Sequence, residues 1–539
     1  MFIATSVAAR LDRAVEAPVR RLRRATGAGP LWLAHTDGVL VQHRRGKFLF
    51  LFDGYLYPDT GLQPHHLLDH LARRQPAEGL RAFKGRYAGL YVDLVTGAIR
   101  AFSDHAGDRD LFFWQRGSGI AVSDDFGALV RSLDLSRRDL DQRAVADFQI
   151  FGFAMGEQTF VRSIRRCPPG SLIEIDHGHV TLRSFWRFAL AEPDASFDAD
   201  AAVEELDALL RQAARRSLAV FGARSRYCLG LSGGLDSRLV AHYFHAEGAD
   251  LFGYSFGEPD ADECQVAGTV ADHFGIDHYR VGRNRELPRY FAASLKYQPM
   301  ADLEWCKYVT GRSALPEFDA LITGFVGNHL FGSISHALPT QEPAGDGELA
   351  AMIYDYYFLA TCDEAARDAS EQRIESLLRE IGGSTLSRCM AFWYRSVKWR
   401  NKHCGLFHDF GRHPHIPIFT DIDVMDFCLR LPPDWLHECR FQRYFFDRKL
   451  PALSVKHLRR DDQQNAHKPI ESWLRDNREF ADAALALLGP AEDQMLLRGR
   501  SLSLREMVGK IVAGHCSRND IHRFFLRLTP LAFQHTYLT

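Results

Sequence analysis

The sequence predicts an α/β protein whose strand-rich first half precedes a second half made of strand-then-helix units. Short apolar runs separated by turn residues extend from Leu31 to Trp186, as is typical of antiparallel strands. Residues 189–200 (ALAEPDASFDAD) are acidic, contain a proline and show no periodicity, so they indicate a linker. Beyond them, residues 226–256 show a strand, a helix and a second strand, and this βαβ pattern favours a parallel sheet.

Turn signals divide both halves into individual elements. In the first half, strands are expected at residues 47–52, 86–94, 98–102, 118–122, 171–175 and 179–185, and helices over residues 64–74 and 141–148. The first of these strands is expected to end at the turn signal Asp53-Gly54. In the second half, we expect helices over residues 203–220 and 237–247, strands at 226–231 and 251–256, and mainly helices after residue 348.

Residues 1–30 are set apart as a basic N-terminal extension. Six arginines lie among Ala, Val and Leu between residues 10 and 24, which favours a solvated helix face. A transit peptide or a membrane-surface helix is the alternative, while the continuous apolar segment of a secretory signal is missing. We therefore expect this extension to precede a first domain over residues 31–188, the linker, and a second domain over residues 201–539.

Length and composition exclude several protein classes. The chain has 539 residues, of which 46% are hydrophobic and 25% charged, and this excludes a collagen-like, disordered or low-complexity protein. A formal net charge of −2 gives no reason to expect a nucleic acid as partner. No apolar run approaches the roughly 18 residues of a membrane-spanning helix. The ten cysteines include no C-x-x-C pair, which indicates reduced thiols in a cytoplasm rather than disulfides or a zinc site.

The most informative segment is residues 231–238, Leu-Ser-Gly-Gly-Leu-Asp-Ser-Arg, between an expected strand and an expected helix. Backbone amides at a helix N-terminus, at the carboxyl edge of a parallel sheet, attract anions. Asp236 would repel a phosphate, so we expect it to hold a divalent cation that bridges phosphates. The segment is not a Walker loop. The alternative is a glycine-rich turn with a serine helix cap.

This segment resembles the pyrophosphate loop of the N-type ATP pyrophosphatases, and its SGGLDS spelling is similar to that of the asparagine synthetase family. Further family-like motifs follow in the same order: Leu251–Gly257 with Asp260–Glu263 and His278, Ile322–Gly324 with Leu330–Gly332, and Pro417–Asp421 with Asp423–Asp426 and Leu431–Pro433. In the first half, three segments resemble the glutaminase motifs of the family: Phe52–Tyr57, Ser103–Arg109 and Ser123–Asp125. The resemblance covers about residues 31–470. It implies an Ntn-hydrolase-like αββα sandwich followed by a doubly wound parallel-sheet ATP-pyrophosphatase domain with a largely helical C-terminal part.

The resemblance also implies ATP and Mg²⁺ as cofactors and a set of site residues. The expected nucleotide-binding residues are Gly230, Leu231, Ser232, Gly233, Gly234, Leu235, Asp236, Ser237, Phe256, Thr323 and Gly324. Asp236 and Asn328 are the expected metal ligands. A cation that stabilises the charge developing during acyl transfer is expected at Lys468, with Arg459 or Arg460 as the alternative.

The first half departs from the glutaminase pattern of the family. Family members that hydrolyse glutamine carry a cysteine directly after the initiator methionine, where this chain has Phe2. Asp53 replaces the asparagine that binds glutamine, and the first cysteine is Cys167. Without a nucleophile, the covalent step of glutamine hydrolysis has no residue. In this respect the chain resembles β-lactam synthetases and lasso-peptide macrolactam cyclases, which keep the domain without its glutaminase activity.

The loop after Thr323 departs from the family as well. Phe325 replaces a residue that has acid or base chemistry in family members, and Asn328 replaces an aspartate. A neutral asparagine oxygen binds a hard cation more weakly than a carboxylate does. His329 could serve as the base instead, since imidazole titrates near neutral pH. The alternative is that His329 only packs within the loop.

These features predict a cytoplasmic, ATP-dependent, AMP-forming ligase that couples a carboxylate to an amine without glutaminase activity. The substrate would be a small molecule or a peptide bearing both groups, and bond formation within one substrate would give a lactam or macrolactam. Two partners are left open: a second copy of the chain, giving a homodimer, and a partner protein that delivers a peptide substrate. The alternatives are an asparagine synthetase that uses free ammonia and a non-catalytic binding or scaffold subunit.

Overall fold

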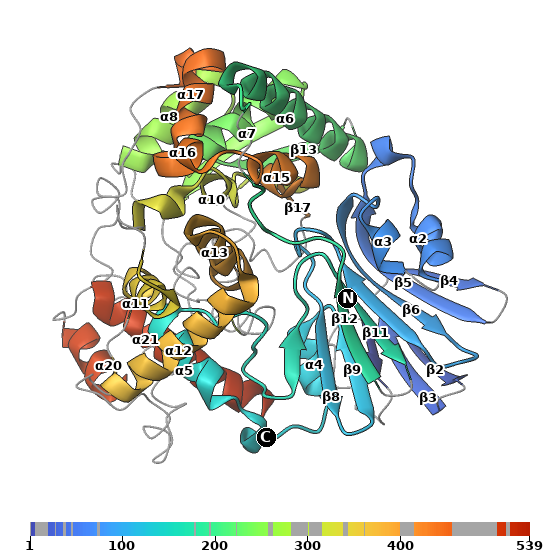
Figure 1. The fold of residues 1–539 in the computed structure, drawn as a ribbon. Helices are drawn as coiled ribbons and strands as arrows, with labels where there is room; N and C mark the ends of the chain where they lie inside the picture. Colours follow the sequence, from blue (N-terminus) through green and yellow to red (C-terminus); the bar gives the residue numbers. More distant parts are fainter. Residues whose placement is uncertain are drawn as a thin grey trace.

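The computed structural model contains two sheet-based domains (Figure 1). It describes residues 2–5, 20–26, 29–35, 39–44, 47–72, 76–176, 179–192, 196–222, 224–256, 262–281, 300, 315–337, 343–359, 362–398, 414–454, 504–513 and 518–538.

The first domain is built on two six-stranded antiparallel sheets. One has the strand order β10-β8-β9-β1-β3-β2 and the other β12-β11-β7-β6-β5-β4. The strands are β1 (Phe2–Thr5), β2 (Arg20–Thr26), β3 (Gly29–His35), β4 (Leu40–Arg44), β5 (Phe48–Leu56), β6 (Gly85–Asp93), β7 (Ile99–Ser103), β8 (Phe112–Arg116), β9 (Gly119–Ser123), β10 (Ile164–Arg166), β11 (Ser171–Asp176) and β12 (His179–Ser184). Buried side chains of both sheets, such as Phe2, Leu33, Leu49 and Leu90, form one apolar cluster, so the sheets pack face to face.

Helices cover the outer face of each sheet. Helices α2 (Pro64–Leu71) and α3 (Pro76–Leu80) pack on the sheet that contains β5. The other sheet is covered by α4 (Phe126–Ser132), α5 (Gln142–Phe151) and α21 (Arg518–Tyr537). The four layers form the expected αββα sandwich, and the expected strands and helices of this half are confirmed except as described next.

The boundary placed at residue 30 is wrong. Strand β1 pairs with both β3 and β9 in the middle of its sheet, and Phe2 and Ile3 are fully buried. The arginine-rich stretch was expected to be helical, but its last part is β2, which pairs with β3 along its whole length. Backbone pairing with the free side of β3 overrides the helix propensity of arginine.

The end expected for β5 at Asp53-Gly54 is also wrong. β5 continues to Leu56 and stays paired with β6 throughout. Gly54 has a φ of 120°, and a Cβ at this position would lie 2.0 Å from the carbonyl oxygen of Arg86. The glycine therefore allows two strands to approach closely rather than forming a turn.

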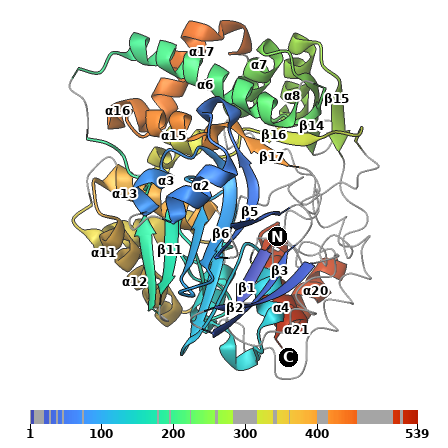
Figure 2. The same cartoon turned by 90° about the vertical axis from the view of Figure 1, so that its right-hand side faces the viewer.

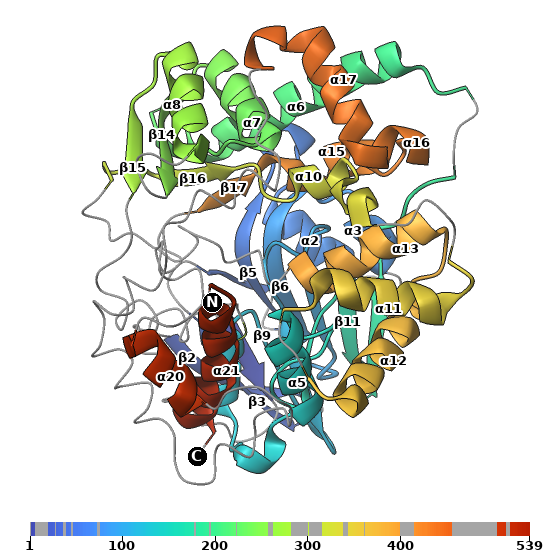
Figure 3. The same ribbon diagram turned by 90° about the vertical axis from the view of Figure 1, so that its left-hand side faces the viewer.

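The last described helix also changes the expected division of the chain. Helix α21 lies beside α5 (Figure 3), and the ring of Phe533 stacks on Phe126 of α4 at 5.7 Å. A second domain that extends to residue 539 is therefore wrong for this helix, which completes the first domain.

The second domain contains a five-stranded parallel sheet in the order β15-β14-β13-β16-β17. Its strands are β13 (Arg226–Gly230), β14 (Asp250–Phe256), β15 (His278–Val281), β16 (Ala320–Thr323) and β17 (His415–Pro417). Helices α6 (Ala199–Phe221), α7 (Leu235–Ala246) and α8 (Asp262–Phe274) lie on one side of the sheet (Figure 2). The elements expected between residues 203 and 256 are confirmed.

Short helical segments complete the described part of this domain. They are α10 (Gly327–Leu330), η5 (Ser333–Ala337), α11 (Asp346–Tyr357), α12 (Glu364–Ile381), α13 (Thr385–Phe392), the π-helical η6 (Trp393–Val397), η8 (Ile418–Thr420), α15 (Ile422–Cys428), α16 (Pro433–Leu436), η9 (His437–Cys439), α17 (Arg440–Lys449) and η10 (Pro451–Leu453). The remaining segments are η1 (Pro58–Thr60) and η2 (Arg137–Asp139) of the first domain, and α20 (Leu504–Ala513). None of the helices in the described residues is long and apolar enough to cross a membrane.

The strand order reverses beside β13. The chain moves from β13 outward through β14 to β15, and then returns to the other side of β13 as β16. The segments that follow β13 and β16 therefore leave the carboxyl edge of the sheet side by side. In open α/β sheets, such a switch point is where ligands bind.

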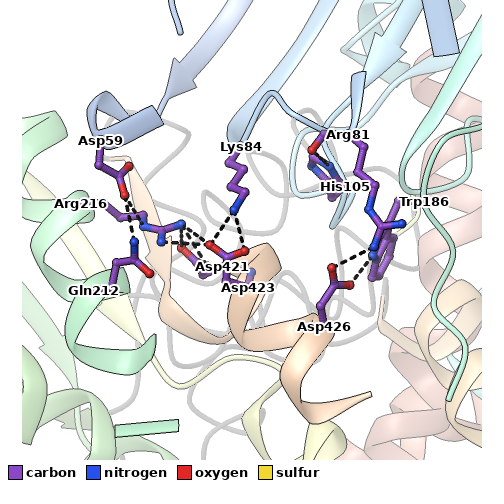
Figure 4. Close-up of polar contacts among 10 residues, drawn as sticks. All are labelled: Asp59, Arg81, Lys84, His105, Trp186, Gln212, Arg216, Asp421, Asp423 and Asp426. Carbon is purple, nitrogen blue, oxygen red and sulfur yellow. Dashed lines mark hydrogen bonds and ion pairs between the residues drawn. The ribbon is translucent and has the colours of Figure 1, made fainter. Parts of the chain in front are cut away.

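Helix α15 connects the two domains through ion pairs (Figure 4). Lys84 of the first domain lies 2.7 Å from Asp423. Arg81 lies 3.2 Å from Asp426, which also accepts a 2.8 Å hydrogen bond from the indole of Trp186. Because α15 follows β17, these contacts fix the first domain relative to the parallel sheet.

Candidate active site

The segment between β13 and α7 forms a loop at the switch point. The Leu231 amide donates to the carbonyl of Tyr254 on the neighbouring strand at 2.8 Å. Gly234 is the N-cap of α7, and no side chain caps this helix. The expected alternative, a serine-capped turn, is therefore not what forms. Amides of an uncapped first turn can bind an anion.

The side chains of Ser232 and Ser237 form hydrogen bonds within this loop. Their hydroxyls lie 3.2 Å apart, and the Ser237 hydroxyl is also 3.3 Å from the carbonyl oxygens of Ser232 and Gly234. Ser237 is buried. Its main contact in this structure is the loop itself, so it shapes the backbone of this loop.

Arg238 is a loop-supporting residue that sequence reasoning missed. Its side chain is fully buried, and it donates hydrogen bonds to the carbonyls of Gly233 at 2.8 Å and Leu453 at 2.9 Å. The guanidinium thus ties the glycine-rich loop to η10. A charged residue directly after the motif was the only available signal.

Asp236 lies in the first turn of α7, against the segment that follows β16. A Cβ at Gly324 would come within 2.7 Å of the Asp236 Cβ, and one at Gly327 within 2.7 Å of its Cγ. Only glycine allows this close approach. Asp236 Oδ2 accepts a hydrogen bond from the Asn328 amide at 2.7 Å, and Oδ1 accepts one from the Gln442 side chain at 2.6 Å.

The charge of Asp236 is set by burial and these two hydrogen bonds. Burial raises the pKa of the Asp236 carboxyl to about 6, although the hydrogen bonds from Gln442 and Asn328 lower it. The group is therefore mostly ionised at neutral pH.

The donor atoms around Asp236 are compatible with a magnesium ion that is shared with a nucleotide. In the residues that the structure describes, no group of three or more His, Cys, Asp or Glu side chains is arranged to hold a metal. Mg²⁺ usually takes one or two protein carboxylates and completes its shell with water and substrate phosphates. Each Asp236 oxygen accepts one hydrogen bond and retains a second lone pair. Asn328, which is exposed, could add a neutral oxygen.

The segment after β16 carries the other expected residues of this edge. Thr323 Oγ1 lies 2.7 Å from His415 Nε2, and the Phe325 amide donates to Thr323 Oγ1 at 3.3 Å. The next residue, Val326, has a φ of 74°. This is a left-handed conformation that is unfavourable for a β-branched side chain. The structure thus brings the loops that follow β13 and β16 together.

His329 packs on an aromatic ring. Its imidazole centroid lies 3.2 Å from the centroid of a Trp393 ring, and Trp393 is buried. The structure therefore gives His329 a packing contact.

Three expected site residues are not described in full. Lys468 and Arg460 lie outside the described residues. Phe256 ends β14, next to β13, but its side chain is outside the described part.

The start of the chain holds two carboxyl groups near Phe2. The Phe2 amide donates to Asp124 Oδ1 at 2.6 Å. Burial acts to raise the pKa of Asp53, but Arg109, 3.5 Å away, and the chain's amino terminus lower it to about 2. Burial raises the pKa of Asp124 to about 7. The Phe2 side chain is buried in the core, so it offers no group to a substrate.

Cys167 does not replace the missing nucleophile. Its side chain is buried, and burial raises the pKa of the thiol far above its ordinary value. The reactive form of cysteine is the thiolate, which is disfavoured here.

Two family models match separate segments of the chain, and the gap between these segments lies between the two domains of the fold. Residues 67–186 match the family model of the glutamine amidotransferase domain, and residues 205–401 match that of asparagine synthase. No curated protein matches the chain.

Solved structures give only distant similarities. A Bacillus subtilis glutamine phosphoribosylpyrophosphate amidotransferase, complexed with ADP and GMP, is 12% identical over 62% of this chain and 77% of its own, with a TM-score of 0.23. An allosteric regulatory enzyme of purine biosynthesis is 11% identical over 60% and 68%, with a TM-score of 0.21. NMN synthetase from Francisella tularensis is 14% identical over 39% and 95%, with a TM-score of 0.20. These scores are too low to support an argument about this chain.

The first matched segment lies within the sandwich and the second within the parallel-sheet domain, and Asp236 lies in the second segment. The chain therefore contains a domain of the glutamine amidotransferase type, followed by a domain of the asparagine synthase type.

Proposed function

We propose that this protein is an ATP-dependent, AMP-forming ligase that joins a carboxylate to an amine. The observation that carries the proposal is the position of Asp236. Its carboxylate lies in an uncapped helical turn at the switch point of a parallel sheet, against the glycines of the neighbouring loop. Helix amides favour phosphate, and a carboxylate among them is sensible when a cation lies between it and the phosphates.

The reaction would proceed in two steps. A carboxylate oxygen of the substrate attacks the α-phosphorus of ATP, and the bond to pyrophosphate breaks. The amine then attacks the acyl carbon, and AMP leaves with the carboxylate oxygen while the amine loses a proton. Magnesium, when bound, would neutralise charge on the triphosphate.

The residues of the chain would act mainly by positioning. The amides in the first turn of α7 would bind pyrophosphate, and Arg238 and Ser237 would keep the preceding loop in place. Lys468 would stabilise the charge that develops on the acyl oxygen, with Arg460 as the alternative. His329 would accept the amine proton, which requires its ring to leave Trp393 or to act from its edge.

The amine would not come from glutamine. The residue after the initiator methionine is Phe2, and its side chain is buried in the core. The sandwich domain would therefore have a structural role, and the amine would belong to the substrate itself, giving a lactam or macrolactam, or to a second molecule.

A non-catalytic binding subunit is the second candidate, and Phe325 and Asn328 favour it. Phe325 has no acid or base chemistry, and its neighbour in the loop is the strained Val326. Such a protein could keep the nucleotide loop without completing amide formation.

Exchange of labelled pyrophosphate into ATP tests the proposal. A ligase exchanges label in the presence of the correct carboxylate, offered as a panel of amino acids and of peptides with free termini. A protein that binds Mg²⁺ and ATP but exchanges with no carboxylate of the panel is the binding subunit. A protein that does not bind ATP at all contradicts both candidates.

A further inference from the structure

The carboxylate of Asp236 is held between two arms of the second domain. The first arm is the segment after β16, whose Asn328 amide donates to Oδ2 at 2.7 Å. The second arm is the first turn of α17, from which the Gln442 side chain donates to Oδ1 at 2.6 Å. Gln442 is 3% exposed, so solvent does not compete for this hydrogen bond.

Backbone strain is concentrated in these two arms. Among the described residues, three that are not glycine have a positive φ: Val326 at 74°, Glu438 at 50° and Cys439 at 55°. Val326 immediately precedes α10, and the other two immediately precede α17. Strain of this kind persists only where the surroundings impose it, and it is common at functional sites. Both turns that deliver a donor to Asp236 are therefore held in unfavourable conformations.

The two arms are also fastened to each other. Ser335 Oγ accepts a 2.8 Å hydrogen bond from the Glu438 amide. Gly332 approaches the second arm so closely that a Cβ would lie 2.2 Å from the carbonyl oxygen of Leu436. Residues 323–335 and 436–442, which we call the clamp, thus contact each other and hold Asp236 between them.

We propose that Gln442 is a positioning residue, which fixes the plane of the Asp236 carboxylate toward a divalent cation on the ATP phosphates. A carboxylate with a donor on only one oxygen can still turn about its Cβ–Cγ bond, whereas donors on both oxygens fix it. Asn328 can add only a neutral oxygen, so the orientation of the Asp236 carboxylate strongly affects how well the cation binds. This inference rests on the proposed function, because it requires a nucleotide-bound cation at Asp236.

The variant Gln442→Met tests this role, because it keeps the length of the side chain and removes its donor. The measurement is binding of ATP by titration calorimetry at increasing Mg²⁺ concentrations. Loss of a residue that orients a metal ligand typically weakens metal binding about 10–100-fold. We expect the half-saturating Mg²⁺ concentration to rise by that factor, while ATP binding at saturating Mg²⁺ stays close to that of the unmodified protein. The melting temperature should fall only by the few degrees that one lost buried hydrogen bond costs.

A matched control and a milder variant complete the design. Gln149, a buried glutamine on α5 of the first domain, is changed to methionine, and its half-saturating Mg²⁺ concentration should not move. Ser335→Ala removes the acceptor that fastens Glu438, and it should raise the half-saturating Mg²⁺ concentration in the same direction. If Gln442→Met does not fold, the Ser335 variant alone decides the outcome.

Each result has a distinct meaning. An unchanged Mg²⁺ requirement in Gln442→Met, or in Ser335→Ala where that variant decides, overturns the positioning role. Lost ATP binding that saturating Mg²⁺ does not restore, in a folded Gln442→Met protein, also overturns it and makes Gln442 a structural residue. If the unmodified protein binds no ATP with Mg²⁺, the proposed function fails first, and the inference fails with it.

Discussion

The guanidinium of Arg216 lies 3.1 Å from the carboxylate of Asp421, and both side chains are 2% exposed. Asp421 is the N-cap of α15. Arg216 also lies 3.0 Å from Asp423 and 3.3 Å from Asp59 of the first domain (Figure 4). The buried guanidinium of Arg216, on α6 of the second domain, therefore contacts the start of α15 in its own domain and Asp59 of the first domain.

Replacing this cation should destabilise the protein strongly. In Arg216→Met, Asp421 would stay buried without its charge partner, and breaking a buried ion pair from one side costs about 3–5 kcal/mol. Urea denaturation should report a loss of unfolding free energy of that size. Arg215→Met is the control, because the neighbouring Arg215 is 64% exposed in its ion pair with Glu247, and it should lose less than about 1 kcal/mol. Equal losses would contradict the role given to Arg216.

His105 should make the protein sensitive to acid. Its imidazole is 2% exposed, and Nε2 lies 3.1 Å from the carbonyl oxygen of Arg81. Burial lowers the pKa of His105 from 6.5 to about 4. Between these values the unfolded chain binds a proton that the folded protein does not, so this residue lowers the unfolding free energy as the pH falls through that window.

The variant His105→Gln should remove this contribution. Between pH 7 and about pH 4.5, its unfolding free energy should fall by about 2–3 kcal/mol less than that of the unmodified protein. Urea titrations at the two pH values measure the difference. The exposed His65 is the matched control, and His65→Gln should keep the original pH dependence. The same pH dependence in all three proteins would show that His105 is protonated normally in the fold.

The purified protein should not hydrolyse glutamine. Phe2 offers no nucleophile, Asp53 is an anion rather than an amide donor, and the Cys167 thiol is buried. Glutamate release, measured with an enzyme-coupled assay, should equal the buffer background. Cys167→Ser tests whether any remaining release depends on that thiol. Release that co-purifies with the protein would refute this prediction.

Asp236 should be the main protein ligand of the nucleotide-bound magnesium. Asp236→Asn should leave the fold intact, because an amide of the same shape fits between Gly324 and Gly327, but it should abolish Mg²⁺-dependent ATP binding. Asn328→Asp should lower the half-saturating Mg²⁺ concentration, because it adds a charged ligand. Circular dichroism checks the fold. Normal Mg²⁺-dependent ATP binding by Asp236→Asn would exclude the metal-ligand role.

His329 should act in the second chemical step only. His329→Phe keeps an aromatic ring against Trp393 but removes the base. It should slow amide formation by about 10²–10⁴-fold and leave pyrophosphate exchange unchanged. His329→Ala, which also removes the packing, should lose stability in addition. If His329→Phe forms product at the normal rate, His329 is a packing residue.

The sequence predicted the strand, loop and helix around Asp236 because local signals were sufficient there. A buried strand, two glycines and a helix surround Asp236 within a few residues, and the βαβ pattern places the loop at the edge of a parallel sheet. The same local reasoning failed at Gly54. Asp-Gly favours a turn in isolation, but pairing of β5 with β6 over nine residues outweighs that preference.

The clamp around Asp236 could not be predicted from sequence. Gln442 lies 206 residues from Asp236 along the chain. The residues next to it in the sequence do not distinguish it from an exposed helical glutamine. The left-handed conformation of Val326 was equally hidden, since valine is among the residues least suited to it. Both features result from contacts between distant segments, which periodicity and spacing do not report.

The return of α21 to the sandwich affects how the protein is synthesised. Phe533 fills a place between Phe126 and Phe160 on the outer face of the first sheet. While the ribosome is still translating residues 189–517, this face has neither α21 nor its aromatic side chains. With only α4 and α5 over this sheet, the apolar side chains around Phe126 and Phe160 are expected to be partly exposed during that interval, which favours aggregation.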